Sequence, residues 1–359
     1  MYEIIWPVAS DPQHRVLWFI EHWYQQWQEM TDLDVEEEGA EGFDFVRWRE
    51  LIAEVDQMHF VAGEGCGSQN SFSSTAPFNP ELETITECRE SGTTAQVFTT
   101  LSEDDCSKYH VYDLVLVDEK DWRIASVMTL FYPPNDAVVA PEKHADILAL
   151  SHIDAPLLPH DEVLQLNENT LFHADREVQL NDLDPAMTVV SEIGKLHVTS
   201  GVLGILDFGY DIYDFEPLER RVKPGEYRVE AVTFHDWVAG IRVRLNDTDT
   251  AVRWFAASTP NGDGAYGVDA GNLAIVDVEN LLTLTNAKKE SLFSRWCQDY
   301  QPQLLSMTMT NDAVITSTGT GDGTYPAFWG VNEAGEVVSL YIDFMILTEE
   351  GENGVYTSI

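Results

Sequence analysis

Three alternate glycines lie in the C-terminal third of the chain, in the sequence TGTGDGTYPAFWG at Thr318–Gly330. A dinucleotide-binding loop has the pattern G-x-G-x-x-G between a strand and a helix, whereas Gly319, Gly321 and Gly323 have the spacing G-x-G-x-G and are followed by proline and aromatic residues. The chain contains no Gly-Lys-Ser/Thr, which excludes the P-loop form. A calcium loop needs acidic residues at its first and twelfth positions, and here these positions hold Thr318 and a tryptophan. The stretch is therefore predicted to be a turn that joins two strands.

Histidines and aspartates are the other residues with chemical potential, and they form no catalytic pattern. The chain contains neither G-x-S-x-G nor H-E-x-x-H. Three His/Asp pairs lie in segments predicted to be linkers or turns: His152/Asp154, His160/Asp161 and His173/Asp175. Four aspartates lie at the ends of apolar runs: Asp207, Asp269, Asp277 and Asp343. Gathered by the fold, such aspartates could bind a cation or act as acid and base, but as single residues they are turn and cap formers. No catalytic residue, metal ligand or cofactor is therefore assigned.

The acidity of the chain is its strongest global feature. It has 62 acidic and 20 basic residues among 359, a formal net charge of -42. Residues 1–140 hold 27 acidic and 7 basic residues and the remainder holds 35 and 13, so the acidity is spread over both halves. Such a charge disfavours binding to nucleic acid or to an anionic membrane and favours a basic protein partner. Ordinary acidic solubility and salt adaptation are the alternative explanations.

The N-terminal sequence MYEIIWPVASDPQHR does not resemble an export signal, because it has no basic start and no long apolar centre. No run approaches the roughly 18 apolar residues of a membrane helix. The four cysteines form no CxxC pair: Cys66, Cys88, Cys106 and Cys297. We therefore expect a cytoplasmic protein with reduced thiols.

The first half predicts two amphipathic helices followed by paired strands. Val16, Ile20, Trp23, Trp27 and Met30 recur at intervals of three and four within residues 14–30. A second helix is predicted over residues 43–58, with Phe45, Trp48, Ile52 and Val55 on one stripe. Strands rich in β-branched and aromatic residues are predicted at 95–101, 108–119 and 121–132, with a hairpin turn at Glu119–Asp121. This order indicates an α+β domain over residues 1–134.

The second half predicts a linker and a mostly-β domain. Residues 135–168 contain several prolines and read as the linker, with a short helix near His144–Leu150. Residues 169–359 contain short apolar runs separated by Gly, Asn and Asp, which is typical of strands and turns.

The sequence YHVYDLVLVDEKDWRIASVMTLFY, which ends at Tyr132, resembles the nuclear-transport-factor-2-like (NTF2-like) fold. The resemblance covers about residues 1–132 and implies that helices close a curved antiparallel sheet into a cone. That family includes isomerases and dehydratases as well as non-catalytic members, among them immunity domains of bacterial toxin systems. Its enzymes place acidic and His residues in the cavity, where His110 and Asp113 could point, but the sequence does not fix which strand face is inward. No catalytic residue is carried over.

The second half resembles a bacterial family known as domain of unknown function 4241 (DUF4241). The resemblance rests on GKLHVTSGVLGILD, VKPGEYRVEAV, YGVDAG, GTGDGTYPAFWG and SLYIDF, and spans about residues 170–344. The resemblance implies no activity. It does imply a genomic context, because such proteins occur in bacterial genomes near secreted polymorphic toxins and are suspected of immunity roles.

These observations together predict a cytoplasmic bacterial immunity protein that binds a cognate basic toxin, for example a nuclease, and neutralises it by occlusion. The expected partner-binding residues form two acidic clusters, which alternatively are solvated loops: Asp32, Asp34, Glu36, Glu37, Glu38, Glu41 and Asp44, then Glu103, Asp104 and Asp105. The rival hypothesis is an enzyme or small-molecule binder that uses the N-terminal cone cavity. An adaptor without a toxin is a third reading that the sequence does not separate from the first.

Overall fold

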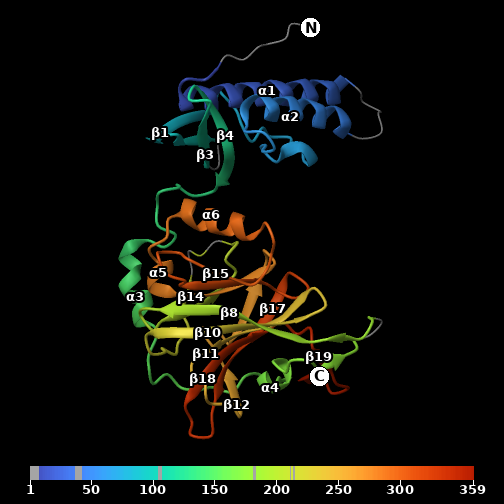
Figure 1. Ribbon diagram of the computed structural model, residues 1–359, viewed down its shortest axis with the longest axis vertical. Helices are drawn as coiled ribbons and strands as arrows, with labels where there is room; N and C mark the ends of the chain where they lie inside the picture. The colour runs from blue at the N-terminus through green and yellow to red at the C-terminus, as the bar shows by residue number, and fades with distance from the viewer. Residues whose placement is uncertain (1–7, 37–42, 104–106, 181–182, 211, 213–214) are drawn as a thin grey trace. The chain divides into compact units, whose positions relative to one another are not determined.

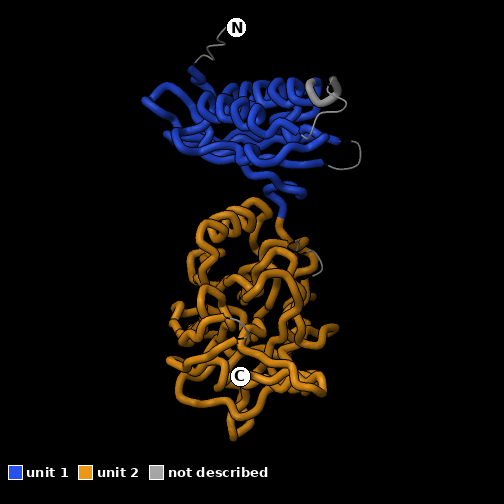
Figure 2. Tube along the Cα trace, turned by 90° about the vertical axis from the view of Figure 1, so that its right-hand side faces the viewer, with its two compact units in different colours: residues 1–136 blue, residues 137–359 orange. Residues whose placement is uncertain are grey.

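The computed structural model describes residues 8–36, 43–103, 107–180, 183–210, 212 and 215–359. The chain divides into two compact units, Met1–Asp136 (unit 1) and Ala137–Ile359 (unit 2), coloured separately in Figure 2. Each unit is described by itself below.

Unit 1 places two helices over one face of a four-stranded antiparallel sheet (Figure 1). The strands follow the chain order β1-β2-β3-β4. The elements are α1 (Pro12–Glu36), α2 (Phe45–His59), the short 3-10 helix η1 (Ser68–Asn70), β1 (Glu83–Ser91), β2 (Thr94–Ser102), β3 (Ser107–Val117) and β4 (Asp121–Leu130). The α+β class predicted from the sequence is confirmed, whereas a sheet of four strands under two helices does not establish the cone.

The predicted helix stripes form most of the core of unit 1. In α1, Val16, Ile20, Trp23 and Met30 are buried and Trp27 is half-buried, and in α2 Trp48, Ile52 and Val55 are buried. They pack on inward-facing strand residues that include Val97, Tyr112 and Ile124. Phe45 is the exception, with 38% of its surface exposed, because it lies in the first turn of α2 where the helix extends past the core.

The predicted hairpin between β3 and β4 is present, with Asp118 and Glu119 in its turn at φ 51° and 57°. Aspartate tolerates this left-handed region better than most non-glycine residues, which accounts for Asp118 in the turn. Strand β1 was not predicted, because its sequence ETITECRES is mostly polar.

Unit 2 is mostly β, as predicted, and its two larger sheets pack face to face. The seven-stranded sheet has the order β12-β17-β18-β11-β10-β8 with β13 also paired to β17, and the four-stranded sheet has the order β15-β16-β14-β9. The strands are β5 (Leu164–Gln165), β6 (Glu177–Val178), β7 (Ala186–Met187), β8 (Val189–Val198), β9 (Leu203–Leu206), β10 (Gly225–Phe234), β11 (Trp237–Arg244), β12 (Arg253–Ala256), β13 (Ala265–Val268), β14 (Asn272–Asp277), β15 (Gln303–Leu305), β16 (Ala313–Ser317), β17 (Gly323–Val331), β18 (Val337–Asp343), β19 (Thr348–Glu350) and β20 (Tyr356–Ser358). The helices are η2 (Pro141–Lys143), α3 (His144–Ala149), α4 (Glu168–Leu171), α5 (Val278–Leu281) and α6 (Asn286–Trp296).

Strand β14 shows why the smaller sheet has an almost continuous apolar sequence. Leu273 and Ile275 face the core between the two sheets, while Ala274 and Val276 face a second core that includes residues of α5 and α6. Both faces of the strand are therefore buried, and an alternation of apolar and polar residues is not required.

The segment 135–168, predicted as a linker, packs within unit 2 from residue 137 onward. Val138 and Val139 are buried, and the backbone N–H of Val138 donates to the carbonyl of Leu284 at 2.9 Å. Helix α3 buries Ile147 in the same core. The segment is irregular and contains prolines, but it packs within unit 2 because its apolar side chains are buried there.

The glycine-rich stretch is the turn that joins β16 to β17, as predicted. The hydroxyl of Tyr325 donates to the carbonyls of Thr318 and Gly321 at 3.0 and 2.7 Å. Gly321 has φ +110°, a conformation that favours glycine. The glycines thus allow the backbone to turn, and the Tyr325 hydroxyl hydrogen-bonds two carbonyls of that turn.

Candidate partner-binding surface

The first predicted acidic cluster lies on the connection between α1 and α2. Asp32 is exposed on α1, and the last turn of this helix carries Asp34 and Glu36. Asp44 is exposed and caps α2. Three members, Glu37, Glu38 and Glu41, lie outside the described residues. The side chain of Asp44 accepts hydrogen bonds from the backbone N–H groups of residues 46 and 47 at 3.0 Å each.

The start of α2 lies beside the end of α1. Trp23 and Trp48 meet edge to face with their ring centroids 5.6 Å apart, and Arg47 forms an ion pair with Glu29 at 2.7 Å. The Glu29 carboxylate raises the pKa of Arg47 by accepting its hydrogen bond. The positive charge of Arg47 therefore has a carboxylate partner already, and the connection keeps its excess of negative charge.

A row of aromatic rings adjoins this acidic connection, and the sequence did not identify it. Phe43 stacks on Phe72 at 4.1 Å between ring centroids, and Phe72 continues to Trp27 at 6.4 Å. Trp27 stacks in turn on Tyr24 at 5.7 Å, while Phe45 meets Phe43 edge to face at 4.8 Å. We call these five residues the aromatic patch.

Every residue of the aromatic patch is at least partly exposed to solvent. Tyr24, Trp27, Phe43 and Phe72 are half-buried, and Phe45 is exposed. Next to Phe45, the side chain of Val46 has 66% of its surface exposed. The surface thus combines aromatic and aliphatic groups with the exposed carboxylate of Asp44.

The second predicted cluster is smaller than expected in the described part of the chain. Glu103 is half-buried between β2 and β3 and forms an ion pair with Lys108 at 2.9 Å. Asp104 and Asp105 lie outside the described residues. The charge of Glu103 is therefore already compensated.

A buried polar cluster lies on the inner face of the unit 1 sheet, and His110 is the one member that the sequence suggests as a candidate. One oxygen of Glu83 accepts hydrogen bonds from Thr99 Oγ1 at 2.5 Å, His110 Nδ1 at 2.7 Å and Tyr112 OH at 3.0 Å. All four residues are at most 4% exposed. Burial and the Glu83 carboxylate raise the pKa of Tyr112 well above its usual value. Among the described residues, the second Glu83 oxygen and His110 Nε2 have no hydrogen-bond partner.

Asp113, the other residue considered for a cavity, faces outward. Its carboxylate accepts from Gln96 Nε2 at 2.9 Å and from Ser126 Oγ at 3.0 Å. It lies three positions after His110, an odd offset, so the two side chains lie on opposite faces of β3. Glu83 is the carboxylate that His110 meets, and no local sequence pattern connects residues 27 positions apart.

A second buried network joins α1, α2 and β4. Arg15 donates to Asp121 at 2.6 Å and to the carbonyl of Trp122 at 2.7 Å. Its Nη1 lies 3.3 Å from Nδ1 of His59, whose Nε2 lies 3.1 Å from Nδ1 of His22. Burial, followed by the charge of Arg15, lowers the pKa of His59 to about 2. Neutral His59 therefore accepts from Arg15 and donates to His22.

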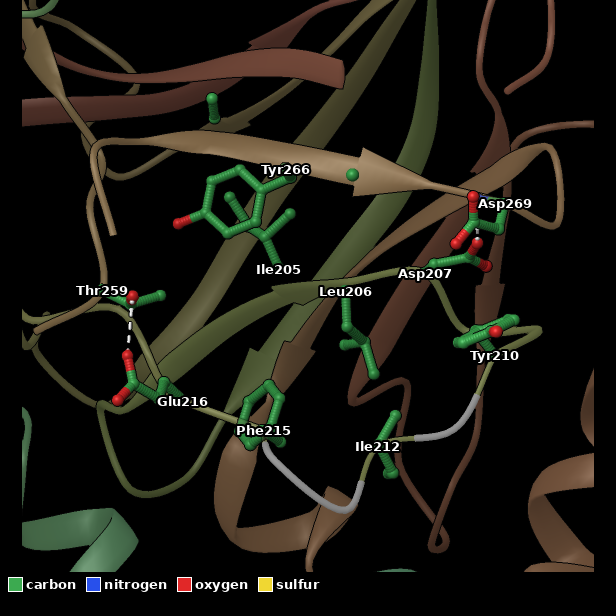
Figure 3. A pocket seen from close by; sticks show the side chains of 12 residues that line it. Ile205, Leu206, Asp207, Tyr210, Ile212, Phe215, Glu216, Thr259, Tyr266 and Asp269 are labelled. Atoms are coloured by element: carbon green, nitrogen blue, oxygen red, sulfur yellow. Dashed lines mark hydrogen bonds between the residues drawn. The ribbon is translucent and has the colours of Figure 1, made fainter. Parts of the chain in front are cut away.

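Unit 2 contains a cavity of about 450 Å³ beside strands β9 and β13 (Figure 3). Leu206, Ile212 and Phe215 form an apolar wall, and carboxylates lie at opposite ends. At one end Glu216 accepts from Thr259 Oγ1 at 2.9 Å. At the other, the carboxylate of Asp207 accepts from the backbone N–H groups of residues 269 and 270 at 2.8 and 2.7 Å. Both carboxylates thus secure loops.

Of the four aspartates expected as possible cation ligands, Asp207 and Asp269 adjoin at one end of this cavity, where the backbone N–H of Asp269 donates to Asp207. Asp277 accepts from the N–H groups of residues 199, 200 and 280, and thereby ties two chain segments together as a cap. No group of three or more metal-binding side chains occurs among the described residues. In the part of the chain that the structure describes, no helix is both long and apolar enough to cross a membrane.

Comparison with known families assigns part of unit 2. A family model described as "Protein of unknown function (DUF4241)" matches residues 196–342, so the chain contains a DUF4241 domain that runs from β8 to β18. The resemblance predicted for residues 170–344 is confirmed over this span. No curated protein and no solved structure matches the chain.

Proposed function

We propose that this protein is a cytoplasmic bacterial immunity protein that binds a cognate basic toxin and neutralises it by occlusion. The observation that carries the proposal is the aromatic patch beside the acidic helix connection. Aromatic residues are enriched at protein interfaces, where they supply large buried areas, whereas charged residues concentrate at the rim.

The acidic residues have a separate role in this proposal. Opposite charges accelerate the encounter of two proteins, and the affinity comes mainly from apolar groups that become buried. Asp32, Asp44 and the carboxylates between them would attract a basic toxin surface. Phe45 and Val46, which are exposed in the free protein, would then lose contact with water.

The domain composition supports the same proposal by analogy. Residues 196–342 form a DUF4241 domain. The sequence resemblance links that family to a suspected immunity role, and we propose such a role for this chain. We further propose that unit 1 is an NTF2-like cone, a fold that also includes immunity domains. Fold analogy alone does not define a function, so the surface carries the argument.

Affinity capture of the tagged full chain from its native host lysate, at low and moderate salt, tests the proposal. We expect one basic protein in near-stoichiometric amount, and we expect the purified protein to block that partner's activity at a 1:1 ratio. Absence of a partner at both salt concentrations would contradict the proposal, as would a partner whose activity persists in the complex.

The second candidate function is a small-molecule binder or enzyme that uses the interior of unit 1. It is favoured by the Glu83–His110 hydrogen bond, since both groups keep an unpartnered buried atom among the described residues. A ligand screen by thermal stability, repeated with His110→Asn, tests it. A ligand that stabilises only the wild-type chain would support this function, and equal stabilisation of both chains would remove it.

A further inference from the structure

A basic stretch of chain lies near one end of the large sheet, where three of its seven strands have a terminus. Neighbouring antiparallel strands place the start of β10, the end of β11 and the start of β18 at the same end of the sheet. The sequence RRVK, residues 220–223, precedes β10 at this end. Three of the 20 basic residues of a chain with net charge -42 thus fall within four positions.

These basic residues line one cavity of about 410 Å³. Its other walls are mainly apolar and aromatic: Ile153, Val222, Tyr227, Leu245, Val337 and Val338. Glu336 is the single carboxylate among the lining residues. Three cations and one anion give the lining a formal charge of +2.

Backbone carbonyls hold the two guanidinium groups in place. Arg220 Nη1 donates to the carbonyl of Ala155, and Arg221 Nη2 donates to the carbonyl of Leu148 at 2.8 Å. A carbonyl fixes the position of a guanidinium without neutralising its charge, and each arginine retains further N–H donors. Tyr227 fixes the backbone of the third basic residue, because its hydroxyl donates to the carbonyl of Lys223.

None of the three cations forms an ion pair with another described residue. Seven other basic residues form ion pairs: Arg15, Arg47, Arg89, Lys108, Arg123, Arg228 and Arg242. What distinguishes Arg220, Arg221 and Lys223 is that three cations without a carboxylate partner among the described residues line the same cavity. A role in stabilising the fold through ion pairs does not account for them.

We propose that this cavity is a binding site for a small organic phosphate. A phosphate monoester carries about two negative charges at neutral pH and three acceptor oxygens on one tetrahedral group. This charge compensates the +2 lining, whereas a single carboxylate would leave it half compensated. Arginine forks and lysine ammonium groups are the side chains that bind phosphate oxygens.

The size and lining of the cavity indicate that the ligand has an organic body. Ligand cavities of roughly 300–1,000 Å³ accommodate small organic molecules, and a bare phosphate would leave most of this space empty. The valines and Leu245 provide apolar contacts for that body, and the ring of Tyr227 provides an aromatic face. The site is independent of the proposed toxin-binding surface, which lies in unit 1.

Phenyl phosphate and benzoate form a matched pair of probes, since they share a ring and differ in the anion. Isothermal titration of the full chain with each probe measures the affinity. We expect saturable 1:1 binding of phenyl phosphate and at least about tenfold weaker binding of benzoate. Benzoate binding of equal affinity would overturn the assignment to phosphate, and absence of saturable phenyl phosphate binding would overturn the site itself.

Two single variants separate the site from the general charge of the protein. Lys223 and Lys288 are both exposed, and Lys288 lies on α6 outside the lining. We expect Lys223→Gln to weaken phenyl phosphate binding at least about fivefold and Lys288→Gln to leave it unchanged. Equal weakening by both variants would overturn the proposal, because only the net charge would then matter.

Discussion

The ring of Phe43 stacks on the ring of Phe72 with their centroids 4.1 Å apart. Phe43 is where the described chain resumes after the acidic connection, and Phe72 lies between η1 and β1. The contact therefore fixes the returning end of the connection against a distant segment of unit 1. The exposed carboxylate of Asp44, next in sequence to Phe43, and the half-buried rings thus form a surface that combines charge with apolar area.

The acidic connection is expected to control the rate of partner association. Changing Glu36, Glu37 and Glu38 to Lys should slow association with the captured partner about tenfold or more at low salt, and less at 0.15 M, because salt screens the attraction. Stopped-flow or surface-based kinetics at both salt concentrations measures this.

The matched control reverses three exposed carboxylates of unit 2: Glu333, Glu349 and Glu352. It changes the net charge by the same amount. Equal slowing by the two triple variants would assign the effect to net charge and remove the connection from the proposed surface.

The Glu83 cluster is expected to stabilise unit 1. Glu83→Ala removes the acceptor of three buried donors, which should reduce the free energy of unfolding by about 3–5 kcal/mol. Glu83→Gln keeps an acceptor oxygen and should cost less. Urea denaturation measures both, with Glu90→Ala in the exposed end of β1 as the control. A Glu83→Ala chain as stable as the control would show that the cluster contributes little.

Asp343 is expected to make unit 2 less stable as the pH rises. The carboxyl is fully buried, which raises its pKa from 3.8 to about 7. Between these values the folded state holds a proton that the unfolded state has lost, so the free energy of unfolding falls as the pH increases from about 4 to 7. Asp343→Asn should remove this loss and stabilise unit 2 at pH 8 by about 1–4 kcal/mol.

Hydrogen–deuterium exchange of the β18 amides at pH 5 and 8, corrected for intrinsic rates, detects the change in unit 2 alone. Asp236→Asn, in the exposed turn between β10 and β11, is the control and should behave as wild type. Identical pH dependence in Asp343→Asn and the wild-type chain would refute this prediction.

His59 is expected to act in the opposite direction in unit 1. Its pKa is lowered from 6.5 to about 2, so below pH 6.5 the unfolded state binds a proton that the folded state does not. The free energy of unfolding should therefore fall as the pH drops, by up to about 1.4 kcal/mol per pH unit from this group. Denaturation of wild type and His59→Asn at pH 7 and 5.5 isolates the effect. A difference between the chains that does not vary with pH would contradict it.

The local elements of unit 1 could be predicted because their periodicity is strong. Trp23 and Trp48 lie on stripes that only a helix brings to one face, and both are buried at the helix contact. Strand β1 escaped prediction because it is an edge strand with polar residues on its exposed positions. The prolines of segment 135–168 predict a linker, but Val138, Val139 and Ile147 in the same segment are buried.

The candidate sites depend on contacts between distant residues, which a single sequence does not reveal. Phe43 and Phe72 are 29 positions apart, and nothing in either local sequence marks the other. His110 was considered for an interior site, but the inward face of β3 is decided by the helices that cover it. Asp207 and Asp277 are the converse case: the turn and cap roles expected of single aspartates are what their hydrogen bonds show.

The most direct test of the central claim is quantitative capture by wild type and by the double variant Phe45→Ser/Val46→Ser. The two side chains are 38% and 66% exposed, so the variant should fold with little loss of stability. A matched control is Leu158→Ser/Val163→Ser, whose side chains in unit 2 are 50% and 41% exposed. We predict that wild type and control retain the basic partner and that Phe45→Ser/Val46→Ser loses at least about 90% of it. Equal retention by all three chains would contradict the claim that this surface binds the toxin.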